Sequence, residues 1–222
     1  MIVRMSNSFI IDNIHQLKAS IPSSVDIVLA TKYATPSDVT LISSHFPTLA
    51  FGENRVQHGE ENQATGIKNP WHFIGHLQRN KAQKVIQHYQ LIQSVDSLRL
   101  LTTLQDTSKK LNMVTPILLQ VNPLHDQAKY GFSIDDVMAQ IEEWSLLSNI
   151  SIKGLMCMAP FDAPNATIKK TFKQTQQLYA KLKSNGFSLS HLSMGMSNDY
   201  PIAIDEGSTM IRIGKKVFES PC

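Results

Sequence analysis

Short apolar runs alternate with longer amphipathic stretches along almost the whole chain, and this alternation limits the possible folds more than any other feature. The apolar runs are rich in β-branched residues and end at turn signals, as buried strands do. They cover residues 27–31, 49–52, 71–75, 91–95, 115–121, 152–158, 191–194 and 210–213. Strands in strict alternation with helices predict a parallel sheet with helices packed on it.

The stretches between these runs carry signals for the beginnings and ends of helices. Thr35 can cap a helix that starts at the following Pro-Ser-Asp, and Ser133 with two aspartates after it resembles a capping box for a helix through Leu147. The longest helix is predicted over residues 165–184, because Asn-Gly follows as a stop signal. An extra helix over residues 10–19 precedes the first strand.

Eight strand–helix units fit a closed (β/α)₈ barrel, the TIM-barrel architecture, within the α/β class. A chain of 222 residues suits one such barrel, and no linker or repeat divides it, so we expect a single domain over residues 1–222. An open doubly wound sheet is the alternative. Periodicity alone does not distinguish the two, because both alternate strands with helices.

Composition argues against nucleic-acid and membrane partners. The net charge is only +3, and the basic clusters fall on a predicted helix among polar residues, as a solvated helix face does. No run of 18 apolar residues occurs, and residues 1–13 lack the apolar core of a signal peptide. Cys157 and Cys222 lie far apart, with no zinc-type spacing. These features favour the cytoplasm.

Two histidines and one cysteine are weak candidates for chemistry. His72 and His76 have the spacing of a helical metal pair, but they fall on and after a predicted strand without nearby carboxylates. We therefore expect structural roles for both and no metal site. Cys157 is interpreted as a small buried apolar residue rather than a nucleophile.

Polar residues gather where the predicted strands end. In a barrel these positions share the carboxyl-terminal rim, where barrel active sites are built. They are Lys32, Glu53, Asn54, Arg55, His76, Gln78, Asn80, Asp96, Ser97, Asn122, Ser197, Asn198 and Gly214. The sequence therefore predicts one site at this end of the barrel.

Lys32 is the most informative of these residues, since it follows the first predicted strand directly. A lysine at a strand end commonly just reaches solvent. A partly desolvated lysine instead keeps a neutral, nucleophilic amine for carbonyl chemistry. The residues alone support both interpretations equally.

Two glycine-bearing turns follow the last two strands. Ser193-Met-Gly-Met-Ser-Asn-Asp contains Gly195, and Met210-Ile-Arg-Ile-Gly-Lys contains Gly214. Glycine lets backbone N–H groups approach an anion closely, and a helix start beyond it adds a favourable dipole. Many barrels bind phosphate at these two loops. The alternative is that both glycines serve only the conformation of tight turns.

Taken in order, the motifs resemble those of the pyridoxal phosphate homeostasis protein family, also called the YggS/PROSC family. The resemblance covers nearly the whole chain, and the motifs beginning at Trp71 and Leu192 are the most specific. The matching segments are TKY at 31–33, FGEN at 51–54, WHFIGHLQRNK at 71–81, QVN at 120–122, GLM at 154–156, LSMGMSND at 192–199 and RIG at 212–214.

This resemblance implies an alanine-racemase-like barrel, of the type called fold type III, that holds one pyridoxal 5′-phosphate (PLP). Carried over residue by residue, it implies a Schiff base on Lys32, Asn54 in contact with the cofactor and Ile74 near the ring. It also implies phosphate contacts from Ser197 and the backbone of Met196, Gly214 and Lys215, and Arg212 facing the pyridine nitrogen. The chain departs from the family's pattern at Lys215, where a small residue is common, and at Glu219, where glycine is common.

The family implies PLP binding, with buffering or delivery of the cofactor to apo-enzymes, and no catalytic residues. A racemase or decarboxylase of the same fold type is the rival, and a phosphate-binding barrel without PLP is a third interpretation.

Arg212 suggests why such a site would store PLP rather than use it. An arginine has only donors, so it favours an unprotonated pyridine nitrogen and weakens the ring as an electron sink. The alternative is that Arg212 pairs with Asp205 or Glu206.

Overall fold

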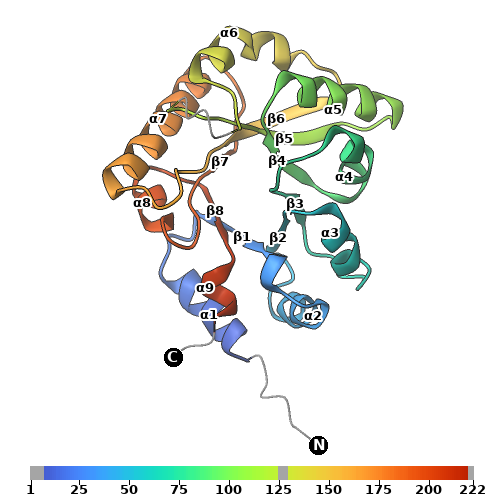
Figure 1. Cartoon of the computed structure of the whole chain (residues 1–222), viewed down its shortest axis with the longest axis vertical. Helices are drawn as coiled ribbons and strands as arrows, with labels where there is room; N and C mark the ends of the chain where they lie inside the picture. Colours follow the sequence, from blue (N-terminus) through green and yellow to red (C-terminus); the bar gives the residue numbers. More distant parts are fainter. Residues whose placement is uncertain (1–7, 125–129, 220–222) are drawn as a thin grey trace, which may run out of the picture.

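The computed structural model describes residues 8–124 and 130–219 and shows a closed parallel barrel with helices around it (Figure 1). The strands follow one another around the barrel in chain order, and β8 pairs with β1 to close it. They are β1 (Asp26–Ala30), β2 (Ala50–Glu53), β3 (Trp71–Phe73), β4 (Leu91–Val95), β5 (Thr115–Gln120), β6 (Ile150–Met156), β7 (His191–Ser193) and β8 (Met210–Ile213). The predicted barrel is thus confirmed, and the open sheet is wrong.

Helices cover the outside of the barrel, and two short 3₁₀ helices lie among them. The α-helices are α1 (Ser8–Ala19), α2 (Pro36–His45), α3 (Val56–Gln63), α4 (Ala82–His88), α5 (Leu98–Lys110), α6 (Ile134–Ser145), α7 (Asn165–Ser184), α8 (Tyr200–Asp205) and α9 (Lys215–Phe218). The 3₁₀ helices are η1 (Thr31–Tyr33) and η2 (Arg79–Lys81). Within the described ranges, no helix is long and apolar enough to cross a membrane.

The helix signals in the sequence correspond to real caps. Thr35 and Asp38 exchange side-chain and backbone bonds at the start of α2, and Ser133 and Asp136 do the same at α6. Helix α7 has the bounds predicted for it, and α1 is the predicted extra helix. Asn13 of α1 donates to the carbonyls of Val217 and Glu219, so α1 packs beside α9 (Figure 1).

Some predicted strand ends were wrong by one or two residues. Thr31 belongs to η1 instead of the first strand, and β3 stops at Phe73. The sixth strand begins at Ile150, two residues earlier than predicted, because Ile150 pairs with Thr115 of β5. It also carries a bulge: Ile117 pairs with Ile152, but Leu118 pairs with Gly154.

Alternating residues of the strands form two separate packing layers. Residues facing outward, such as Leu29, Phe51 and Ile213, join the helices in one large cluster. Residues facing inward form a smaller cluster inside the barrel: Val28, Leu91, Leu118, Met156 and Met210. The packed interior means that the barrel is no pore, and any ligand must bind at its ends or near them.

Candidate functional site

The residues predicted for the site lie at the carboxyl ends of five strands that are neighbours in the closed barrel. In order around the barrel these strands are β7, β8, β1, β2 and β3. Met196 and Ser197 follow β7, Arg212 lies on β8 with Gly214 and Lys215 after it, Lys32 follows β1, Asn54 follows β2, and Ile74 follows β3. We call this arc the site arc. The pairing of β8 with β1 brings the residues of the site arc near the end of the chain next to those near its beginning.

Lys32 lies in η1, directly beyond the end of β1. Its side chain is exposed, and Nζ lies 4.8 Å from the centroid of the Tyr33 ring. Of the two interpretations of Lys32, the structure matches the one in which its side chain reaches solvent, and not the one in which the amine is partly desolvated. An exposed amine at the mouth of the barrel is accessible to a ligand arriving from solution.

The loops after β7 and β8 meet at Ser197 and Gly214. The Gly214 N–H points to Ser197 Oγ at 3.4 Å, a long bond that leaves both groups open to a stronger acceptor. A Cβ on Gly214 would lie only 3.3 Å from the Ala30 Cβ, so a glycine suits this close approach of β8 to β1. Hydroxyl and backbone N–H side by side are donors that suit a phosphate.

Met196 and Lys215 are the other two residues predicted to contact the phosphate. The Met196 N–H donates to Asp199 Oδ1 at 2.5 Å, so this N–H would have to exchange partners to bind a phosphate. The Lys215 side chain is exposed and pairs with Glu219, with 3.1 Å between Nζ and Oε1. The contact predicted for Lys215 comes from its backbone N–H.

Arg212 is buried inside the barrel, 5% exposed. Its guanidinium donates to Ser193 Oγ at 2.5 Å and to the Cys157 carbonyl at 2.8 Å. Burial lowers the pKa of Arg212, while Cys157 and Asp199 raise it. The alternative that Arg212 pairs with Asp205 or Glu206 is wrong, since its guanidinium turns into the barrel and Glu206 pairs with Lys169.

Behind Arg212, a chain of buried hydrogen bonds runs through the barrel, and the sequence did not reveal it. Ser193 Oγ donates to Gln93 Oε1 at 2.7 Å, and Gln93 Nε2 donates to His72 Nδ1 at 3.0 Å. An amide nitrogen can only donate, so His72 accepts at Nδ1. Burial and, next, the charge of His191 lower the pKa of His72 to about 4. His72 is therefore neutral and structural at physiological pH.

His76 lies at the rim and bonds elsewhere. Its Nδ1 lies 2.9 Å from Asp96 Oδ2, and its ring stacks on that of Tyr130 with 4.3 Å between centroids. In the part of the chain that the structure describes, no three His, Cys, Asp or Glu side chains are arranged to hold a metal ion.

Two cavities lie at opposite ends of the barrel. One, of about 520 Å³, lies at the amino ends of the strands and is lined by His72, His191 and Met210 among others. The other, of about 490 Å³, is lined by Lys32, Glu53, Asn54, Arg55 and His58. We assign the site to the second, because barrel active sites lie at the carboxyl ends of the strands and the site arc adjoins it.

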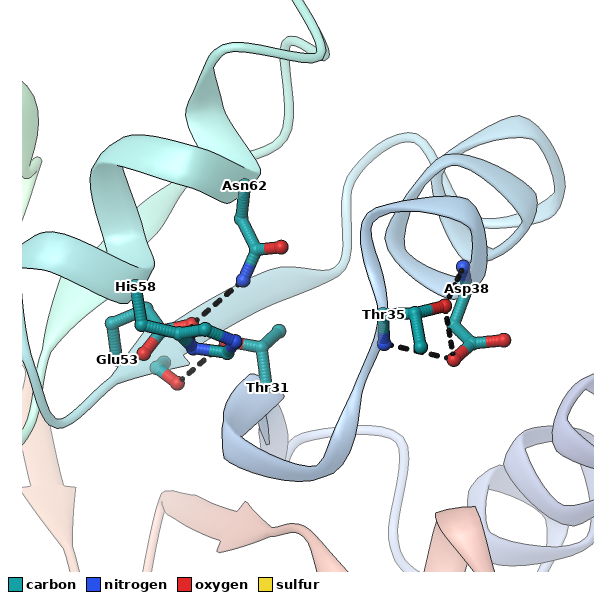
Figure 2. A network of polar contacts seen from close by, with 7 residues as sticks. Thr31, Thr35, Asp38, Glu53, His58 and Asn62 are labelled. Carbon is teal, nitrogen blue, oxygen red and sulfur yellow. Dashed lines mark hydrogen bonds and ion pairs between the residues drawn. The ribbon is translucent and has the colours of Figure 1, made fainter.

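A buried polar network next to Lys32 was also missed (Figure 2). Glu53, at the end of β2, is 1% exposed and binds Thr31, His58 and Asn62. The sequence placed Glu53 at a strand end but gave no role to His58 or Asn62. No spacing pattern in the sequence marks a contact between a helix side chain and the strand that precedes the helix.

Comparison with known proteins assigns the family. Residues 7–220 match the profile of the alanine racemase N-terminal domain. The pyridoxal phosphate homeostasis protein of Synechocystis is 35% identical over 207 residues, which are 91% of this chain and 94% of the relative. The chain belongs to the pyridoxal phosphate homeostasis protein family.

Solved structures agree with this assignment. PipY of Synechococcus elongatus, whose structure was solved with PLP bound, has a TM-score of 0.87 and 33% identity, over 95% of this chain and 100% of PipY. An alanine racemase of Clostridium difficile has a TM-score of 0.81 at 16% identity, over 97% of this chain and 57% of the racemase. The latter likeness concerns the fold alone.

The chemistry of the site arc fits the cofactor that the family implies. PLP has an aldehyde, a phosphate and an aromatic ring with one nitrogen acceptor. Lys32 offers a primary amine, Ser197 and Gly214 offer donors for an anion, and Arg212 offers a guanidinium inside the barrel mouth. Ile74 packs partly buried against the inner cluster, where an apolar ring face could rest.

Proposed function

We propose that this protein binds PLP at the site arc, holds it as a Schiff base on Lys32 and serves PLP homeostasis by buffering and delivering the cofactor. The observation that carries this proposal is the adjacency of the Lys32 turn to the loops bearing Ser197 and Gly214, which follows from the pairing of β8 with β1. PLP supplies an aldehyde carbon that forms a reversible imine with a primary amine.

Each residue of the arc then has a role. Ser197 Oγ and the N–H groups of Gly214, Met196 and Lys215 hold the phosphate. The Arg212 guanidinium faces the ring nitrogen and, being a donor, favours its unprotonated form. Asn54 contacts the cofactor, and Ile74 packs near the ring. The fixed position of Arg212 against Ser193 and Cys157 supports its role, because a held guanidinium loses little entropy when it binds a ligand.

We further propose a carrier rather than an enzyme, working in the cytoplasm and meeting apo PLP-dependent enzymes transiently. The names of the relatives, which are called homeostasis proteins, support this proposal.

Borohydride reduction tests the covalent link. The protein is incubated with PLP, reduced and digested, and its peptides are analysed by mass spectrometry. We expect the reduced cofactor on the peptide containing Lys32 and none on the peptide containing Lys215, whose amine pairs with Glu219. Trapping at Lys215 instead would refute the assignment, and absence of any adduct would favour a phosphate-binding barrel without PLP.

Hydrogen exchange at the α-carbon tests the carrier against the rival racemase. Racemisation needs two acid–base groups on opposite faces of the substrate. We expect L-alanine in deuterated water, with the PLP-loaded protein, to exchange its α-proton far more slowly than about 1 s⁻¹, a low turnover number for an enzyme. Mass spectrometry of the recovered alanine measures this rate, and turnover at or above that value would establish an enzyme.

A further inference from the structure

Three side chains contact a single oxygen of Glu53 at the end of β2 (Figure 2). Its Oε1 accepts from the Thr31 hydroxyl and from Asn62 Nδ2 at 2.9 Å, and it forms an ion pair with His58, with 2.8 Å between Oε1 and Nδ1. Thr31 directly precedes Lys32, and His58 lies in the first turn of α3. The buried carboxylate of Glu53 therefore contacts both the turn that carries Lys32 and the imidazole of His58.

This carboxylate determines how the His58 ring is protonated. An ionised carboxylate oxygen offers only lone pairs, so the contact of 2.8 Å with Nδ1 of His58 requires a proton on Nδ1. In the neutral ring, Nε2 is then left with its lone pair. Among residues 8–124 and 130–219, Nε2 of His58 has no bonding partner. A carboxylate that holds one imidazole nitrogen commonly orients the other for proton transfer.

The free edge of His58 and the amine of Lys32 open into the same space. Both line the cavity of about 490 Å³ together with Glu53, Asn54 and Arg55. His58 is 31% exposed, so solvent reaches its ring. The charged groups around it are Lys32 from η1, Glu53 from β2 and Arg55 at the start of α3. Tyr89, at the end of α4, also lies near Glu53. Burial, and next the negative charge of Glu53, raise the pKa of Tyr89, so its phenol stays neutral.

Formation of an imine needs a group that takes and returns a proton. An ordinary lysine is an ammonium at neutral pH and must lose a proton before its nitrogen can attack a carbonyl carbon. The carbonyl oxygen must then leave as water, which takes up a proton. The balanced step converts R–NH₃⁺ and an aldehyde into a protonated imine and one water. The reverse step, release by hydrolysis, needs the same transfers in the opposite order.

We propose that His58, oriented by Glu53, transfers these protons for Lys32 and so sets the rate at which the protein loads and releases PLP. This inference rests on the proposed function. Such a proton-transfer group would speed exchange of the cofactor. It lowers the activation barrier for both formation and hydrolysis of the imine and leaves the binding equilibrium unchanged.

The test is the rate of imine formation, followed by stopped-flow absorbance after mixing with PLP. A positioned proton-transfer group contributes about 100-fold to such rates, so in His58→Ala we expect loading and release both to slow by about that factor. Equilibrium affinity should stay within about twofold, because catalysts do not shift equilibria. His45→Ala, on the exposed end of α2, is the matched control and should load as the parent does.

Two further measurements separate proton transfer from a structural role. Imidazole added to His58→Ala should restore much of the rate, since it supplies the missing base in the space left by the side chain. His58→Gln keeps a donor for Glu53 but has no basic nitrogen, so it should stay slow. Loading of His58→Gln at the parent's rate, a parallel loss of affinity, or failure of imidazole to rescue would each overturn the inference. If the parent protein itself forms no imine, the proposed function fails, and the two failures are thus distinguishable.

Discussion

Lys32→Ala is expected to abolish covalent PLP binding and leave the fold intact. The absorption band of the imine should disappear, and affinity for PLP should fall by at least about 100-fold, equivalent to roughly 2.7 kcal/mol. The remaining affinity would come from the phosphate donors around Ser197 and Gly214. Absorbance titration and equilibrium dialysis measure the two effects.

The structure explains why folding should survive this change. The Lys32 side chain is exposed, and its contact with the Tyr33 ring, at 4.8 Å from the centroid, contributes at most about 1 kcal/mol. Urea unfolding should therefore give nearly the parent's free energy. Lys110→Ala, at the exposed end of α5, is the control and should retain PLP fully. An unchanged imine band in Lys32→Ala would disprove the assignment of the lysine.

Gly154→Ala is expected to lower the free energy of unfolding by about 4 kcal/mol or more. Few single substitutions have so large an effect, and a backbone clash is one cause of it. Gly154 sits beside the bulge of β6 with φ +155°, and a Cβ there would lie 1.8 Å from the carbonyl oxygen of His191 on β7. Because that oxygen belongs to the backbone of the neighbouring strand, the clash cannot be relieved by rotating a side chain. The ladder between β6 and β7 would have to separate.

The matched control is Gly186→Ala. Gly186 also has a positive φ, +93°, but a Cβ there would meet nothing within 4 Å. It should therefore cost only the conformational strain, roughly 1–2 kcal/mol. Urea unfolding of both variants measures the difference. If Gly154→Ala is no worse than Gly186→Ala, β6 and β7 can adjust and our account of the bulge is wrong.

The residues of the site that the sequence could indicate are those tied to strand ends. Lys32, Asn54, Ser197 and Gly214 follow apolar runs directly, so the barrel hypothesis places them on one rim. His58 escaped because its contact with Glu53 joins a strand end to a helix turn, and no spacing rule marks such a contact. The barrel-spanning chain escaped for a similar reason, since Ser193 and Gln93 lie 100 residues apart.

The sequence by itself determined the local elements and their order, because helix and strand periods and capping residues act over a few neighbouring positions. Thr35 and Ser133 cap their helices as local chemistry requires. Only the tertiary structure decided that β8 pairs with β1, since both an open and a closed sheet satisfy the same periodicity. That pairing sets the glycine turn of Gly214 against Ala30, beside the Lys32 turn, and buries Arg212 among neutral oxygens. The site therefore depends on long-range contacts, whose partners are chosen by packing of the whole barrel rather than by any local pattern.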